Sequence, residues 1–183
     1  VTTPARTAYD LGRHLPRGQA IARMDALMHA TPYSFEDVRL LAKRHAGARG
    51  LRRLHIALAD VDGGAASPRE TWLRLLLIDA GFPAPTTQIP VLDGSRPVAF
   101  LDMGWEEFKV AAEYDGDQHR RDRSQYVKDI RRHEVVDDLG WHVVRVVAED
   151  RPQVVVDRVD AALRRRGYRR DRRQCAEQGR IRR

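Results

Sequence analysis

Four side chains that can bind a metal ion or carry a proton follow one another at two-residue spacing in the segment "AAEYDGDQH". They are Glu113, Asp115, Asp117 and His119, and they come directly after an apolar run that is typical of a β-strand. An unpaired carboxylate inside an apolar strand is costly to bury, so function explains Glu113 better than structure does. Asp115 precedes Gly116, and Asp-Gly is also an ordinary turn signal.

A further carboxylate, Asp102, lies on the preceding strand of the expected hairpin. If the hairpin turns near Glu106 and Glu107, Asp102 comes within a residue or two of the position opposite Glu113. Carboxylates that close repel one another unless a cation neutralises them. Oxygen ligands favour Mg²⁺ or Mn²⁺, which can polarise a phosphate and lower the pKa of a bound water. The sequence therefore predicts a metal site that hydrolyses phosphodiesters, with His119 as acid or base.

The elements that must position these residues follow from the hydrophobic periodicity and from turn and cap signals. Helices are predicted over residues 6–15, 18–30, 34–47, 51–61, 67–81, 124–139 and 152–167. Strands are predicted over residues 87–92, 96–105, 108–116 and 141–147, and we expect the first three to be antiparallel. The order of elements predicts a mixed α/β (α+β) fold, preceded by helices alone.

Composition and charge place the chain in a broad class. The chain has 183 residues, 42% of them hydrophobic, without an apolar run near the roughly 20 residues that a membrane span needs. Its one cysteine, Cys175, excludes an intramolecular disulfide and fits a reducing cytoplasm. The net charge of +7 is concentrated at the end of the chain, where ten arginines and two acidic residues lie between Arg164 and Arg183. We expect this tail to be disordered, and either to attract phosphates or only to aid solubility.

The combined motifs resemble a known family. Asp102 with Trp105 is followed by "EYDGDQH", then by Asp129 with Arg132, then by "LGW" and a strand that ends near Arg145. This pattern, over about residues 66–150, resembles the endonuclease-like family related to the very-short-patch-repair endonucleases, within the PD-(D/E)XK nuclease superfamily. The resemblance implies a restriction-endonuclease-like core of about four strands flanked by helices.

The resemblance also implies roles for individual residues. Asp102, Glu113 and Asp115 would hold Mg²⁺ or Mn²⁺, and His119 would manage the proton. Asp115 stands where the superfamily usually has a lysine, and Lys109, expected on the same strand face as Glu113, is a weak substitute. Residues implied to contact nucleic acid, with DNA as the favoured substrate, are Arg132, Arg145 and Lys109.

Several positions have two readings from the sequence. The family's first core helix points an acidic residue at its site, which would be Glu70, but Ser67 and Glu70 also form a capping box. Asp129 and Arg132 lie one helical turn apart and could pair only with each other. Arg145 could bind phosphate or neutralise a carboxylate of the site.

The domain organisation follows from these assignments. We predict a helical subdomain over residues 1–65, a nuclease-like core over 66–168 and a basic tail over 169–183. The helical part resembles segments of actinobacterial proteins related to abortive-infection antitoxins, which implies a DNA-binding module ahead of Val1. The superfamily resemblance also allows a homodimer that cuts both strands. The alternatives are a nuclease-like fold that binds nucleic acid or regulates without catalysis, and a protein-binding accessory domain.

Overall fold

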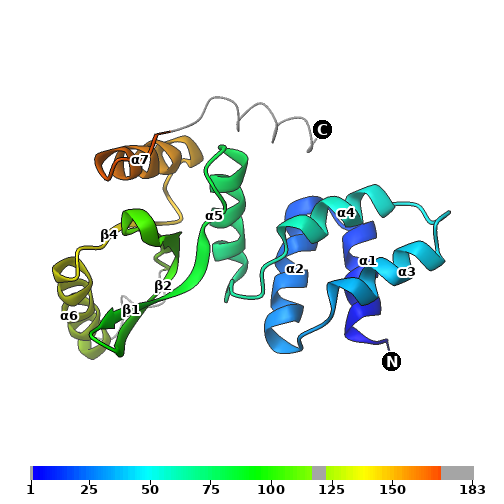
Figure 1. The fold of residues 1–183 in the computed structure, drawn as a ribbon, viewed down its shortest axis with the longest axis horizontal. Coiled ribbons are helices and arrows are strands. Elements are labelled where there is room, and N and C mark those ends of the chain that lie inside the picture. The colour runs from blue at the N-terminus through cyan, green and yellow to red at the C-terminus, as the bar shows by residue number, and fades with distance from the viewer. Residues whose placement is uncertain (1, 117–122, 170–183) are drawn as a thin grey trace. The chain divides into compact units, whose positions relative to one another are not determined.

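The N-terminal part of the chain is a bundle of helices (Figure 1). The computed structural model describes residues 2–116 and 123–169, and residues 123–129 by their backbone alone. The first four helices are α1 (Pro4–His14), α2 (Arg17–Ala30), α3 (Phe35–Arg44) and α4 (Leu51–Asp60). All four predicted helices are confirmed. Their shared apolar core includes Tyr9, Ile21, Met24, Val38 and Leu54.

The C-terminal part is built on a four-stranded sheet. Its strands are β1 (Thr86–Asp93), β2 (Arg96–Trp105), β3 (Val110–Tyr114) and β4 (His142–Val146), in the order β1-β2-β3-β4. The first three strands are antiparallel, as predicted, and β4 runs parallel to β3. A parallel neighbour requires a crossover, which helix α6 (Arg123–Asp138) provides. The mixed α/β fold class is therefore confirmed.

Two helices cover the sheet. Helix α6 packs against β2 and β4, and helix α7 (Pro152–Arg165) packs against β3 and β4 (Figure 1). Val136 and Trp141 join strand residues such as Ile89, Leu101 and Ala111 in one apolar cluster. None of the helices within the described ranges is long and apolar enough to cross a membrane.

The chain divides into two compact units inside helix α5 (Pro68–Asp79), between Leu75 and Leu76. The sequence had suggested a boundary between residues 65 and 66. The first turns of α5 belong with the helical unit because Thr71 and Arg74 both bond to Asp25 of α2.

The hairpin between β1 and β2 turns where the sequence indicates. Asp93 pairs with Arg96, so Gly94 and Ser95 form a two-residue loop. Gly94 has a φ of 60°, in the left-handed region that such tight hairpin loops require and that glycine adopts without strain. The register then shifts by one residue between Val91 and Leu92, so the faces of β2 from Ala99 onward follow from the pairing of Val91 with Ala99.

Gly104→Ala is expected to destabilise the unit that contains the sheet by about 1–3 kcal/mol. Gly104 pairs with Ala111, and an added Cβ would lie 2.8 Å from the Ala111 Cα and collide with the carbonyl oxygen of Val110. Both are backbone atoms of β3, so the strands themselves would have to separate. Urea denaturation followed by circular dichroism measures the loss.

Gly116→Ala is the matched control, because a Cβ at Gly116 meets no atom within 4 Å. Its effect is expected to stay within about 0.5 kcal/mol. Equal losses in the two variants would show that the strands at Gly104 are not packed as closely as described.

Candidate functional site

The β2–β3 hairpin brings two carboxylates together. Met103 pairs with Ala112, and the same register continued by one residue places Asp102 opposite Glu113. Directly opposite residues of an antiparallel pair project from the same face, with Cβ atoms roughly 5 Å apart. The Asp102 carboxylate accepts a hydrogen bond of 2.9 Å from the backbone N–H of Tyr114, which holds it against β3. Glu113 is buried, with 7% of its surface exposed.

An arginine from α6 completes the surroundings of Glu113. The Arg132 guanidinium donates to Glu113 Oε1 at 2.6 Å and to the carbonyl oxygen of Phe100 at 2.5 Å. The Arg132 side chain is 31% exposed, so one side of this ion pair faces solvent. The sequence had two interpretations for Arg132, a contact with nucleic acid or an ion pair with Asp129. The Asp129 side chain lies outside the described residues. Periodicity within one helix cannot reveal a partner on a strand.

Arg145 lies in register with Glu113, because β3 and β4 pair these two residues. Arg145 is exposed, and within the described part of the chain its guanidinium contacts no acceptor. It lines a cavity of about 340 Å³ together with His133, Val136, Asp137, His142, Val143 and Arg158. Arg158 donates to Asp150 Oδ2 at 3.1 Å and to the Arg145 carbonyl oxygen at 2.6 Å. Arg145 is therefore the cation on this strand that is available to an anion.

Lys109 is not on the strand face of Glu113, which corrects the sequence prediction. A 3₁₀ turn, η1 (Glu106–Phe108), precedes it, and Lys109 itself adopts a left-handed conformation with a φ of 48°. Strand β3 begins only at Val110. The Lys109 Nζ donates to the Leu139 carbonyl oxygen at 2.9 Å, just beyond the end of α6, where a cation stabilises carbonyls without a helical partner. Lys109 thus stabilises the end of a helix.

Glu70 serves as a helix cap in the N-terminal unit. Its backbone N–H donates to Ser67 Oγ at 3.2 Å, and its carboxylate accepts from the N–H of Ala66 at 2.8 Å. These bonds engage the carboxylate with the backbone and correspond to the capping alternative read from the sequence.

The remaining predicted residues follow β3. Asp115 is exposed, and its backbone N–H donates to the Val146 carbonyl oxygen at 2.8 Å, which extends the pairing with β4. Asp117 and His119 lie outside the described residues. The basic tail from residue 170 onward lies outside them too.

The donor set of the described site is a pair of carboxylates. Within residues 2–116 and 123–169, no three histidine, cysteine or acidic side chains are grouped so that they could hold a metal ion. Mg²⁺ typically takes one or two protein carboxylates and fills its other positions with water and substrate phosphate. Asp102 and Glu113 provide the two carboxylates that Mg²⁺ typically needs. Arg132 would compete with the metal for the Glu113 oxygen.

A second group of charges is buried in the helical unit. Asp25 is 1% exposed, and its carboxylate accepts from the Asp62 N–H, the Thr71 hydroxyl and the Arg74 guanidinium at 2.7–2.8 Å. Arg74, itself 3% exposed, also donates to the Asp60 carbonyl oxygen. Burial raises the pKa of Asp25, although its hydrogen bonds and the Arg74 charge oppose this.

This buried cluster is structural rather than chemical, because both Asp25 oxygens are used by protein donors. This cluster was not predicted, although the sequence contains a signal for it. Asp25 follows Ile21 by four residues and so falls on the apolar stripe of α2, where an unpaired carboxylate would be costly.

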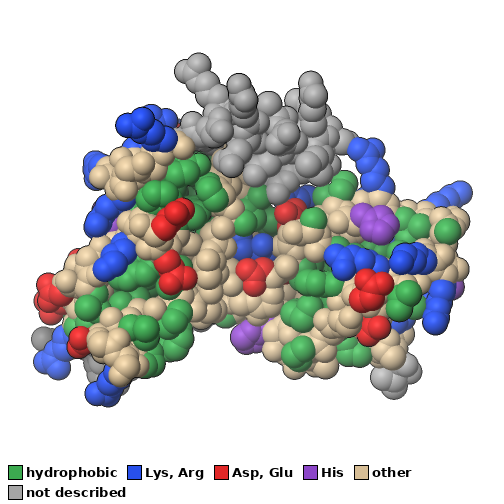
Figure 2. Space-filling view, in the orientation of Figure 1, with side chains coloured by type: hydrophobic (Ala, Val, Ile, Leu, Met, Phe, Trp, Pro, Cys, Tyr) green, Lys and Arg blue, Asp and Glu red, His purple; other side chains and the backbone are tan. Residues whose placement is uncertain are grey.

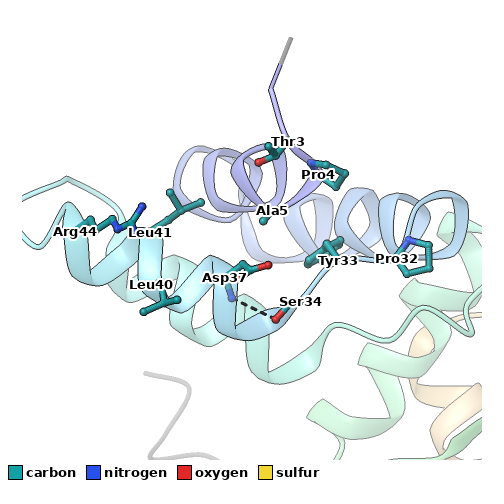
Figure 3. A pocket seen from close by; sticks show the side chains of 10 residues that line it. All are labelled: Thr3, Pro4, Ala5, Pro32, Tyr33, Ser34, Asp37, Leu40, Leu41 and Arg44. Atoms are coloured by element: carbon teal, nitrogen blue, oxygen red, sulfur yellow. Dashed lines mark hydrogen bonds between the residues drawn. The ribbon is translucent and has the colours of Figure 1, made fainter.

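The helical unit also has an open pocket of about 440 Å³ (Figure 3). It lies between the start of α1 and helix α3, and it is lined by Thr3, Pro4, Ala5, Pro32, Tyr33, Ser34, Asp37, Leu40, Leu41 and Arg44. The N–H of Asp37 donates to the Ser34 hydroxyl at 3.3 Å, as Figure 3 shows, and this bond caps α3. The lining lacks a nucleophile paired with a base, so this pocket has no evident catalytic chemistry.

Comparison with known proteins finds similarity to uncharacterized proteins of Mycobacterium tuberculosis, from strain CDC 1551 / Oshkosh and strain ATCC 25618 / H37Rv. Each is 30% identical to this chain over 149 residues, which are 81% of this chain and 55% of the relative. The chain therefore spans about half the length of the curated relatives it matches. No family model matches the sequence, and no solved structure matches it.

Proposed function

We propose that this protein is a divalent-metal-dependent endonuclease that hydrolyses phosphodiester bonds in DNA. The observation that carries the proposal is the position of the Asp102 carboxylate, which the Tyr114 N–H holds against β3 next to the buried Glu113. Two carboxylates on one strand face favour a cation, and the family resemblance assigns both positions to metal ligands.

The chain's own residues have distinct tasks in this proposal. Asp102 and Glu113 hold the metal, and the Tyr114 N–H fixes the orientation of the Asp102 carboxylate. A bound Mg²⁺ or Mn²⁺ would supply Lewis-acid polarisation of the phosphate and a water of lowered pKa. When substrate binds, the Arg132 guanidinium would leave Glu113 and donate to a phosphate oxygen instead. The Arg132 side chain is partly exposed, so a phosphate can reach it from the solvent side. Arg145 would neutralise a neighbouring phosphate.

Cleavage of supercoiled plasmid tests the proposal. The 183-residue protein is incubated with plasmid in Mg²⁺, in Mn²⁺ and in EDTA, and the products are separated on an agarose gel. We expect nicked or linear plasmid with either metal and intact plasmid in EDTA, because the carboxylates would hold the ion that the reaction needs. Equal nicking in EDTA contradicts the proposal, as does a lack of cleavage on plasmid, single-stranded DNA and RNA.

A second candidate is a nuclease-like module that binds nucleic acid without cutting it. The ion pair between Arg132 and Glu113 favours it, because that pair neutralises the buried carboxylate without a metal. This candidate predicts salt-dependent binding that persists in EDTA and in Glu113→Ala. The nuclease predicts that the same variant binds but does not cut.

A further inference from the structure

The β1–β2 hairpin exposes an apolar face. Phe100, Leu92 and Val98 are 55%, 50% and 37% exposed. Their neighbours in β2, Ala99 and Leu101, point to the opposite face and are buried. Figure 2 shows hydrophobic side chains at the surface where Figure 1 places this hairpin. The face is therefore available to a partner outside the described chain.

This apolar face runs directly into the candidate site. Phe100 precedes Asp102 by two residues, so both project from the same face of β2, roughly 7 Å apart along the strand. The Phe100 carbonyl oxygen and Glu113 Oε1 accept from the same guanidinium group of Arg132. One nucleotide can span that separation between an aromatic ring and a phosphate held at the carboxylates.

A cation lies at the carboxylate end of the apolar stretch. Arg132 lies there, and its guanidinium donates to the Phe100 carbonyl oxygen and to Glu113. At the hairpin end the register shifts by one residue, and Arg96 pairs with Asp93, which shares the face of buried Val91 rather than that of Phe100. An aromatic ring next to a cation matches a nucleotide, in which a base adjoins a phosphate.

We propose that Phe100 is a stacking platform for an unpaired nucleobase next to the scissile phosphate. The substrate class is then single-stranded DNA, or duplex with a locally unpaired base, because bases inside an intact duplex are already stacked on their neighbours. A single base stacked on an aromatic side chain contributes enough affinity to be measured, and every base has a face that can stack. The inference rests on the proposed function for the position of the scissile phosphate.

The test measures binding and cleavage separately on one oligonucleotide. A fluorescein-labelled single strand is titrated with the 183-residue protein in EDTA, and fluorescence anisotropy gives the dissociation constant. We expect Phe100→Ala to weaken binding about 5- to 100-fold. Phe100→Trp should retain the affinity and Phe100→Leu should lose most of it, because leucine keeps apolar bulk but has no ring.

Leu40→Ala is the matched control, since Leu40 is a comparably exposed apolar residue, 41% exposed, in the helical unit. It should bind as tightly as the unmodified protein. Strand cleavage is then measured on the same oligonucleotide with Mg²⁺ or Mn²⁺. Base stacking is also followed with 2-aminopurine in the strand, whose fluorescence should change on binding to the unmodified protein and much less with Phe100→Ala.

The outcomes separate the two proposals. Three results would overturn the stacking platform. Phe100→Ala could bind as tightly as the unmodified protein, Leu40→Ala could lose as much affinity as Phe100→Ala, or the protein could fail to bind single strands. A shift from dimer to monomer in Phe100→Ala, with unchanged DNA affinity, overturns it in favour of an interface between copies. Ring-dependent binding without any metal-dependent cleavage supports the platform and overturns the endonuclease. Metal-dependent cleavage, together with binding that does not depend on the Phe100 ring, supports the endonuclease and overturns the stacking platform.

Discussion

Glu113→Gln is expected to reduce metal-dependent cleavage of plasmid about a hundred-fold or more. Glutamine keeps the size of the side chain and an oxygen that can accept from Arg132, but it removes the negative charge that would hold the metal. Lewis-acid stabilisation of the transition state contributes several kcal/mol, and each 1.4 kcal/mol is a factor of ten in rate. Initial nicking rates at saturating Mg²⁺ measure the effect.

The control for Glu113→Gln is Glu107→Gln, at an exposed glutamate of the same unit. It should cut at the rate of the unmodified protein. Asp102→Asn should lose cleavage as Glu113→Gln does while it keeps an oxygen for the Tyr114 N–H, so circular dichroism spectra should coincide for all three variants. Persistent nicking by Glu113→Gln would assign the activity to another site or to a contaminant.

Asp25→Ala is expected to lower the free energy of unfolding of the helical unit by about 3–5 kcal/mol. The substitution leaves the Arg74 guanidinium, which is 3% exposed, without its carboxylate partner. It also removes the acceptor for the Asp62 N–H and the Thr71 hydroxyl. Substitutions that leave a buried charge without a counterion are among the most destabilising single changes. Urea denaturation at neutral pH measures the loss.

Asp10→Ala is the control for the buried pair, because Asp10 pairs with Arg6 at 2.8 Å on the surface, where both side chains are more than a third exposed. Its cost should stay below about 1 kcal/mol. The double variant Asp25→Ala with Arg74→Met should cost less than the sum of the two single variants, because the second change removes the stranded charge. Similar losses in Asp25→Ala and Asp10→Ala would show that the buried pair contributes no more than a surface pair.

The local elements could be predicted from the sequence because their causes are local. Ser34 and Ser67 begin helices because their hydroxyls accept nearby backbone N–H groups, and Gly94 turns the hairpin because its φ is positive. Hairpin spacing also predicted that Asp102 would lie near Glu113, since short antiparallel connections determine register. The function of that pair remains a proposal.

Only the tertiary structure decided which partners these side chains have. Arg132 bonds to Glu113 and Lys109 to the end of α6 because a helix and a strand far apart in the chain are packed together. Asp25 and Arg74 meet across 49 residues, which moves the boundary between the units into α5. Hydrophobic periodicity and turn chemistry act over a few residues, so the sequence by itself determined the elements and the hairpin. Long-range pairing of charges depends on how those elements pack, and it decided whether each charged residue is a site candidate, a cap or a buried support.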